Sequence, residues 1–225
     1  MKAVLFGTNK EAVRTLAEEA GFTIVENDPE CVISYGGDGT LMRSESAYPK
    51  VLKVLLRDSS ICKKCSAFSN EEVLKKVISG SYTTEKLWKL EARVGDKILR
   101  AVNDVIVHNQ NPRHGIRYTL KIQGKPFGKV IIGDGIVVAT PFGSTAYYRS
   151  ITDSYFEVGI GLAFNNSTEQ ADHIVLKDDS VIELEVSRGP AVVFADNDPE
   201  ELILQDGDQV LIKRSEEYTE IVCPL

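Results

Sequence analysis

The sequence predicts a two-domain protein, with an α/β N-terminal domain over residues 1–82 and a β-rich C-terminal domain over residues 83–225. Short apolar runs alternate with amphipathic segments up to about residue 82, which is typical of a mostly parallel sheet covered by helices. Beyond that point, short runs of alternating character are separated by turn signals, which is typical of antiparallel strands. The pattern leaves open whether the last residues return to the first domain.

The composition excludes several classes of protein. The chain has 225 residues, 43% of them hydrophobic, and a formal net charge of -7, which argues against broad binding to nucleic acid or anionic membranes. No apolar run approaches the roughly 20 residues that a membrane span needs. The start of the chain leads into a strand pattern and not into a signal peptide. Four cysteines are too few for a disulfide framework. We therefore expect a cytoplasmic protein.

In the first domain, strands and helices are expected to alternate. Amphipathic spacing ending at Gly21 predicts the first helix. A later helix is predicted from a capping box, in which Ser69 and Glu72 each bond the other's backbone N–H, and it closes at Gly80. The expected strands are 2–7, 22–25, 31–35 and 51–56, and the expected helices are 9–20, 41–47 and 69–79.

In the second domain, the clearest runs of period-two character predict strands at 89–94, 117–122, 181–186 and 209–212. Glycine, proline and aspartate mark the turns between them. The predicted turns are 95–96, 124–126, 177–179 and 206–208. Together they indicate an antiparallel β domain.

A glycine-rich loop follows the predicted strand at 31–35 and reads Gly36-Gly37-Asp38-Gly39-Thr40. In a parallel sheet, ligands bind beyond the carboxyl ends of strands, where this loop is expected. Its glycines allow close approach to the backbone, and successive N–H groups can bind an anion. Asp38 could accept a proton or hold a metal. A tight strand-to-helix turn with a capping aspartate explains the same residues without a ligand.

A second chemical stretch, residues 133–147, interrupts the β pattern with Thr140-Pro141-Phe142-Gly143-Ser144-Thr145-Ala146-Tyr147. Proline ends the preceding strand. Ser144 and Thr145 are suited to cap a following helix, whose first N–H groups would attract phosphate. A capped turn with no ligand is the alternative. Upstream, Asn103 and Asp104 interrupt an apolar run, so at least one of them needs a buried partner, either a ligand or a turn.

These stretches, with Asp134-Gly135, resemble the NAD kinases in order and approximate spacing over most of the chain. The glycine motif alone also occurs in lipid kinases and phosphofructokinases, whereas the Thr-Pro-x-Gly-Ser-Thr-Ala-Tyr stretch is specific. The resemblance implies the NAD kinase/diacylglycerol kinase-like fold, an α/β domain followed by a β-rich domain, with the active site between them. It also implies a homodimer or homotetramer.

The implied activity is phosphorylation of the 2′-hydroxyl of the adenosine ribose of NAD, giving NADP, with ATP or polyphosphate as donor and Mg2+ as cofactor. Asp38 would act as general base or orient the hydroxyl, and no residue is assigned as a metal ligand. The other implied site residues are Gly37, Gly39 and Thr40 for the donor, Asn103 and Asp104 for NAD hydroxyls and amides, Asp134 for the nicotinamide side, and Thr145, Ala146, Tyr147 and Ser150 for adenine and ribose.

Basic residues that could meet phosphates are Arg113, His114, Arg117 and Arg149. Arg149 is favoured because it adjoins the matching motif, whereas a solvated strand edge explains the others equally well. Cys62 and Cys65 have redox or metal-ligand spacing, but no second cysteine pair follows, so a surface loop is favoured.

The sequence departs from the family in four places. Asp104 stands where many members have Glu, and Phe142 replaces the usual Thr. Residues 57–65 replace an Asn-x-Gly-x-Leu-Gly-Phe segment, and the stretch after Ser150 lacks Gly-Gly-Pro. Two further hypotheses therefore stay open: a related kinase of another hydroxyl, and a catalytically weak NAD(P)-binding sensor.

Overall fold

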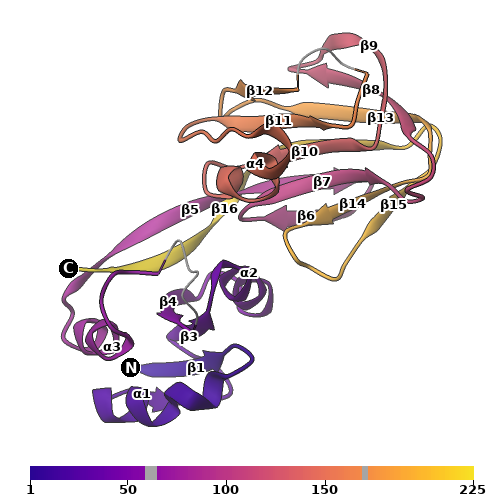
Figure 1. Ribbon diagram of the computed structural model, residues 1–225. Helices are drawn as coiled ribbons and strands as arrows, with labels where there is room; N and C mark the ends of the chain where they lie inside the picture. Colours follow the sequence, from indigo (N-terminus) through magenta and orange to yellow (C-terminus); the bar gives the residue numbers. More distant parts are fainter. Residues whose placement is uncertain (59–64, 169–171) are drawn as a thin grey trace. The chain divides into compact units, whose positions relative to one another are not determined.

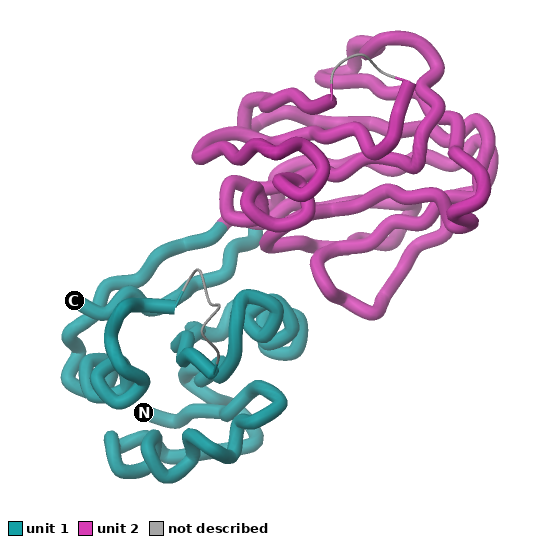
Figure 2. Tube along the Cα trace, viewed as in Figure 1, with its two compact units in different colours: residues 1–87, 217–225 teal, residues 88–216 magenta. Residues whose placement is uncertain are grey.

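The computed structural model describes residues 1–58, 65–168 and 172–225, which form two compact units (Figures 1 and 2). Unit 1 consists of residues 1–87 and 217–225, and unit 2 of residues 88–216.

Unit 1 is built on a parallel sheet with strand order β2-β1-β3-β4, as the alternation of apolar runs and amphipathic segments predicts. Residue Ile221, near the end of the chain, pairs in parallel with Lys53 on the far side of β4. The elements are β1 (Lys2–Phe6), η1 (Lys10–Val13), α1 (Arg14–Ala20), β2 (Thr23–Ile24), β3 (Cys31–Gly36), α2 (Asp38–Ala47), β4 (Leu52–Arg57) and α3 (Asn70–Ile78).

Helices α1 and α3 pack against every second residue of β1, β3 and β4, which form one hydrophobic cluster. The predicted capping box of α3 is confirmed, because Ser69 Oγ accepts from the Glu72 N–H at 3.2 Å and Glu72 Oε2 accepts from the Ser69 N–H at 2.8 Å. The helix expected at 9–20 begins instead with the 3-10 turn η1, and it ends as predicted at Gly21, whose φ is 107°.

Unit 2 contains two sheets of antiparallel strands, which confirms the predicted antiparallel pattern. One sheet has the order β16-β13-β8-β9 with β5 and β6 attached, and the other has the order β12-β11-β10-β7-β14-β15. The remaining elements of the chain are β5 (Tyr82–Val94), β6 (Lys97–Ala101), β7 (Asp104–Asn109), β8 (Ile116–Ile122), β9 (Lys125–Gly133), β10 (Gly135–Ala139), η2 (Gly143–Thr145), α4 (Tyr147–Thr152), β11 (Ile160–Asn165), β12 (His173–Leu176), β13 (Ile182–Arg188), β14 (Ala191–Ala195), β15 (Leu202–Leu204) and β16 (Gln209–Pro224). The residues of β5 and of β16 are divided between the two units.

Strand β10 is buried on both faces, which explains its unbroken apolar sequence. Ile136 and Val138 join the core between the two sheets. Val137 and Ala139 point to the other face, where they pack with the buried Tyr148 of α4. Helix α4 therefore covers this second face of β10.

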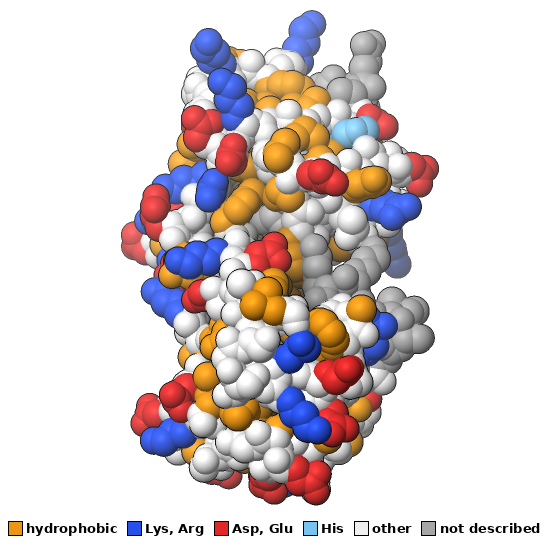
Figure 3. Space-filling model, turned by 90° about the vertical axis from the view of Figure 1, so that its left-hand side faces the viewer, with side chains coloured by type: hydrophobic (Ala, Val, Ile, Leu, Met, Phe, Trp, Pro, Cys, Tyr) orange, Lys and Arg blue, Asp and Glu red, His pale blue; other side chains and the backbone are white. Residues whose placement is uncertain are grey.

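Acidic and basic side chains are interspersed over the described part of the face in Figure 3. Among the described residues, no helix combines the length and the apolar character that crossing a bilayer would require.

Candidate functional site

The glycine-rich loop of unit 1 connects β3 to α2, at the carboxyl end of a parallel strand. Helix α2 begins at Asp38, three residues before the predicted start, with Gly37 as its N-cap. The carbonyl of Gly37 accepts the Thr40 N–H at 2.9 Å. The half-buried Asp38 therefore lies in the first helical turn, where the helix dipole favours a negative charge.

Close packing explains two glycines in this region. A Cβ on Gly36 would lie 2.1 Å from Thr40 Oγ1, so a larger residue would push the first turn of α2 off the strand. Gly7, which follows β1, has a φ of 136°, and a Cβ there would lie 2.2 Å from the carbonyl oxygen of Tyr35. The loops after β1 and β3 thus pack directly on each other.

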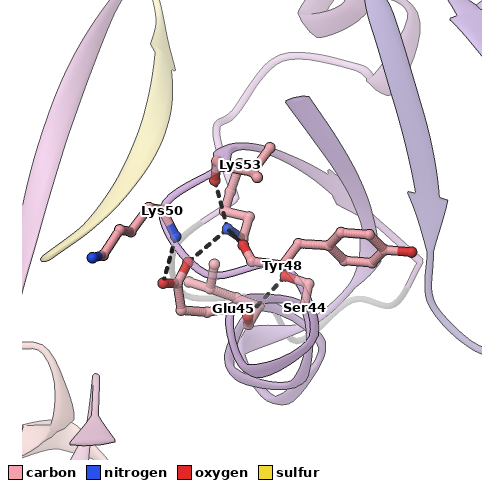
Figure 4. A network of polar contacts seen from close by, with 7 residues as sticks. Ser44, Glu45, Tyr48, Lys50 and Lys53 are labelled. Carbon is pink, nitrogen blue, oxygen red and sulfur yellow. Dashed lines mark hydrogen bonds and ion pairs between the residues drawn. The ribbon is translucent and has the colours of Figure 1, made fainter. Parts of the chain in front are cut away.

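A buried ion pair fixes the far end of α2 (Figure 4). Lys53 Nζ lies 2.6 Å from Glu45 Oε2, and the two side chains are 0% and 4% exposed. The ammonium also donates to the carbonyls of Tyr48 and Val51, at 2.8 and 2.5 Å, while Glu45 Oε1 accepts the Lys50 N–H at 3.2 Å. The pair ties the end of α2 to β4 and so holds the helix that begins with Asp38.

In unit 2, the turn that contains Asn103 and Asp104 is held by Asp196. The Asp196 carboxylate accepts the N–H groups of Val102 and Asn103 at 2.7 Å each, and that of Asp104 at 3.2 Å. Both predicted side chains are buried, at 7% and 5% exposure. Sequence reasoning missed Asp196, although a polar residue directly after the apolar strand β14 was an available signal.

The same turn brings two carboxyl groups together. Burial, followed by the charge of Asp196, raises the pKa of Asp104 to about 7. Burial also raises the pKa of Asp196, to about 6, although three backbone donors and Lys89 act in the opposite direction. Near neutral pH, Asp104 is thus partly protonated, so it can donate a hydrogen bond as well as accept one.

One buried acceptor in this turn is left without a partner. Asn103 Oδ1 makes no hydrogen bond to any described residue. Such an atom costs free energy unless a ligand or water satisfies it. The turn therefore has the character of a binding site for a polar ligand with a hydrogen-bond donor.

The second chemical stretch, residues 133–147, is in direct contact with this turn. Thr140 Oγ1 donates to the Val102 carbonyl at 2.6 Å and accepts the Gly143 N–H at 3.0 Å. A Cβ on Gly143 would lie 2.1 Å from the Asn103 carbonyl oxygen, so only glycine fits. The predicted N-cap role of Ser144 and Thr145 is wrong, because α4 begins after Ala146 with no side-chain cap. The Ser144 hydroxyl instead lies 2.8 and 2.9 Å from two loop carbonyls, those of Pro141 and Phe156.

Tyr147 and Asp134 lie at the other end of β10. The Tyr147 hydroxyl accepts from Asn165 Nδ2 at 3.1 Å, and the Asn165 carbonyl accepts the Asp134 N–H at 2.9 Å. The two carboxylate oxygens of Asp134 accept amide groups of Asn109 and Asn166, at 3.0 and 3.1 Å. Because Asp104 pairs with the last residue of β10, five positions beyond Asp134, the two aspartates are separated by roughly 17 Å of strand.

The remaining predicted residues surround the start of α4. Thr145 lies in η2 and Ala146 is exposed at the N-cap. Arg149 and Ser150 are exposed on the helix; the Arg149 guanidinium lies 6.0 Å from the ring of Tyr155, and the Ser150 hydroxyl donates to the Tyr147 carbonyl at 2.7 Å.

Two further expectations concern metal and redox chemistry. Within residues 1–58, 65–168 and 172–225, no group of three or more His, Cys, Asp and Glu side chains could hold a metal ion. Cys62, the first residue of the predicted Cys-x-x-Cys spacing, lies outside the described residues.

Comparison with known proteins places these features in a family. The sequence profile of the ATP-NAD kinase C-terminal domain matches residues 102–223, which is more than half of the chain. The NAD kinase of Pectobacterium atrosepticum is 29% identical over 211 residues, covering 87% of this chain and 71% of that protein.

Two other relatives match a shorter stretch. The NAD kinase of Sulfurisphaera tokodaii is 33% identical over 141 residues, covering 62% of this chain and 55% of that protein. That of Saccharolobus islandicus is 28% identical over 144 residues, covering 64% and 57%. The chain thus spans little more than half the length of these two relatives.

Solved structures share the fold. Yeast NADH kinase, solved with NADH, has a TM-score of 0.87 and 16% identity, covering 100% of this chain and 84% of that chain. An NAD kinase from Archaeoglobus fulgidus, solved with ATP, has a TM-score of 0.82 and 20% identity, covering 98% and 93%.

Proposed function

Because the chain belongs to the NAD kinase family, we propose that it transfers a phosphoryl group from ATP or inorganic polyphosphate to the 2′-hydroxyl of the adenosine ribose of NAD, producing NADP. The observation that carries the proposal is the buried Asn103–Asp104 turn, which lies within the segment that matches the family and presents an acceptor without a described partner. The relatives named above, one solved with NADH and one with ATP, support the two substrates.

In this proposal, the side chains of unit 2 bind the dinucleotide. Asn103 Oδ1 accepts a hydrogen bond from a ribose hydroxyl or an amide of NAD. Asp104, partly protonated near neutral pH, donates to or accepts from a second group. Tyr147, the first residue of α4, contributes its ring and hydroxyl to the adenine and ribose pocket together with Thr145, Ala146 and Ser150, and Asp134 serves the nicotinamide side.

The chemistry is assigned to Asp38. Its carboxylate accepts the proton of the 2′-hydroxyl while the hydroxyl oxygen attacks the terminal phosphorus of the donor. The bond between that phosphorus and the bridging oxygen breaks, and the shortened donor leaves with the electron pair. Gly37, Gly39 and Thr40 shape the donor side of the same loop, where backbone N–H groups at a helix start favour anions.

The residues of the site are compatible with a magnesium ion that binds together with the donor phosphates. The described residues offer no three-ligand cluster, and Mg2+ in phosphoryl-transfer sites is held mainly by substrate phosphates, waters and one or two carboxylates. Asp38 is the carboxylate of the glycine loop that would supply such a contact. When bound, the ion neutralises charge on the donor phosphates.

The test is NADP formation from NAD and Mg2+ with either ATP or tripolyphosphate, read by an NADP-specific dehydrogenase. NADP with either donor supports the proposal. If NAD binds in calorimetry and no NADP forms with any donor, the protein is an NAD-binding sensor and the kinase proposal fails. If NAD does not bind and another hydroxyl compound is phosphorylated, the related-kinase alternative replaces it.

A further inference from the structure

The two carboxyl groups at the Asn103–Asp104 turn of unit 2 have different hydrogen-bond partners. The Asp196 carboxylate accepts three consecutive backbone N–H groups, at 2.7, 2.7 and 3.2 Å. The side chain of Asp104, a residue that is only 5% exposed, accepts no hydrogen bond from any residue that the structure describes. A buried carboxylate without donors is unfavourable, so Asp104 is the group of the two that is better suited to carry a proton.

The backbone brings these two groups close together. Val105 of β7 pairs with Ala195 of β14, and the Asp196 N–H donates to the Asp104 carbonyl at 3.0 Å. Two neighbouring carboxyl groups disfavour each other's ionisation, and the one with the hydrogen-bond donors keeps the charge more easily. The geometry therefore assigns the negative charge to Asp196 and the proton to Asp104.

The surrounding charges agree with this assignment. The charge of Lys89 on β5, a residue that is 4% exposed, favours the ionised form of Asp196. On the other side of Asp104, β10 places Ala139 opposite it, and residues 140–146 include no acidic or basic side chain. Burial and the charge of Asp196 raise the pKa of Asp104 to about 7, whereas that of Asp196 is raised only to about 6.

We propose that Asp104 binds the dinucleotide as a neutral carboxylic acid and donates a hydrogen bond to it, with Asp196 and Lys89 as positioning residues that keep the proton on Asp104. The inference rests on the proposed function and specifies the protonation state in which the first substrate is recognised. It also limits which part of that substrate the turn can hold.

The turn then offers one acceptor and one donor from adjacent residues. The acceptor is Asn103 Oδ1, which is buried without a described partner, and the donor is the carboxyl O–H of Asp104. A group that both donates and accepts fits this pair, such as two neighbouring ribose hydroxyls or a carboxamide. An ionised phosphate does not fit, because it has no proton to donate to Asn103. The ligand of the turn is therefore an uncharged hydroxyl or amide portion of NAD.

Binding of this kind is linked to a proton. A ligand that accepts a hydrogen bond from the acid favours its protonated form, so the pKa of Asp104 is higher in the complex than in the free protein. Above about pH 7, NAD binding should take up a proton from the buffer, and the affinity should fall as the pH rises. If Asp104 bound instead as a carboxylate that accepts a hydrogen bond, both signs would be reversed.

The test is calorimetric titration of NAD into full-length wild type, Asp104→Asn and the control Asp198→Asn. Each titration is run at pH 6, 7 and 8, in two buffers of different ionisation enthalpy, because the difference in observed heat gives the number of protons exchanged. The control makes the same substitution near Asp196, at a carboxylate that accepts only the Glu200 N–H. Thermal unfolding curves verify that each protein is folded.

We expect wild type and the control to take up roughly 0.5–0.9 proton per NAD at pH 8 and little at pH 6, with an affinity up to about tenfold weaker at pH 8 than at pH 6. Asp104→Asn should take up no proton, and its affinity should not fall over this range, because an amide group donates at every pH. An aspartate with a purely structural role would change the affinity without changing the proton count.

Three results overturn the inference: no proton uptake or a proton release by wild type at pH 8, uptake that persists in Asp104→Asn, and loss of NAD binding by a folded Asp104→Asn protein. Failure of the proposed function has a different signature. In that case no NADP forms, while wild type still binds NAD with proton uptake. A wild-type protein that does not bind NAD overturns both.

Discussion

At the scale of single residues, Asp196 organises the site of unit 2 without belonging to any motif. Its carboxylate takes up three consecutive backbone N–H groups, which sets the direction in which Asn103 and Asp104 point. Removing it leaves buried donors without partners, each costing about 1–3 kcal/mol.

Replacing Asp196 by alanine should therefore weaken NAD binding by roughly tenfold or more, because 1.4 kcal/mol corresponds to a factor of ten. The control is Asp198→Ala in the same loop, where only the Glu200 N–H is lost. Calorimetric titration with NAD gives both affinities. Equal affinity in the two variants would show that the turn does not depend on Asp196.

The pairing of Asp104 with Asp196 also predicts a pH effect on stability. Since burial and a neighbouring charge raise the pKa of Asp104 to about 7, above its ordinary value of 3.8, the folded state holds this proton more tightly than the unfolded state. The stabilising contribution is complete below about pH 4 and is lost as the pH rises toward 7.

The variant Asp104→Asn carries no such titration. The melting temperature of the variant minus that of wild type should increase from pH 5 to pH 8. The reason is that only wild type has to ionise a buried carboxyl group at position 104, which destabilises it as the pH rises. Thermal unfolding at several pH values measures the difference. A difference that stays constant or falls over this range contradicts the assigned pKa.

Of the residues that form this site, only those within the sequence motifs could be predicted from the sequence. Asn103 and Asp104 were found because polar side chains interrupt an apolar run. Their partner Asp196 lies more than 90 positions away and is joined to them only by the antiparallel pairing of β7 and β14. Likewise, Gly143 was found as part of a motif, but its close contact with the Asn103 carbonyl is a tertiary feature.

At the scale of elements, α2 is held between a glycine loop and a buried ion pair. The hydrophobic pattern placed its start at Leu41, because the glycines ahead of it are poor helix formers. The helix begins at Asp38, where a carboxylate in the first turn and the contact between Gly36 and Thr40 outweigh that preference. By contrast, local signals were sufficient for α3, whose capping box involves only neighbouring residues.

Breaking the ion pair should destabilise unit 1 strongly. Lys53→Met leaves Glu45 buried without its cation, for which about 3–5 kcal/mol of unfolding free energy is expected to be lost. The double variant Glu45→Leu/Lys53→Met removes both charges and should recover much of the loss. Urea denaturation of wild type and the two variants measures these free energies of unfolding. A Lys53→Met variant as stable as wild type would contradict a structural role for the ion pair.

At the scale of the whole molecule, each unit has its own hydrophobic cluster, and the long strands β5 and β16 run through both. The sequence suggested only short strands at 89–94 and 209–212, because charged residues such as Glu216 and Glu217 interrupt the apolar pattern of β16. The class of fold was nevertheless predictable from the two kinds of periodicity, and the TM-scores of 0.87 and 0.82 confirm it. The expected homodimer or homotetramer stays a prediction.

The most direct test of the proposed chemistry is the rate of NADP formation by Asp38→Asn at saturating NAD and donor. The matched control is Asp96→Asn, the same substitution in the exposed turn between β5 and β6. We predict a rate at least roughly 100-fold below wild type, the scale of an acid–base group, with NAD affinity and the control rate unchanged. An Asp38→Asn protein that makes NADP at the wild-type rate would contradict the role of Asp38.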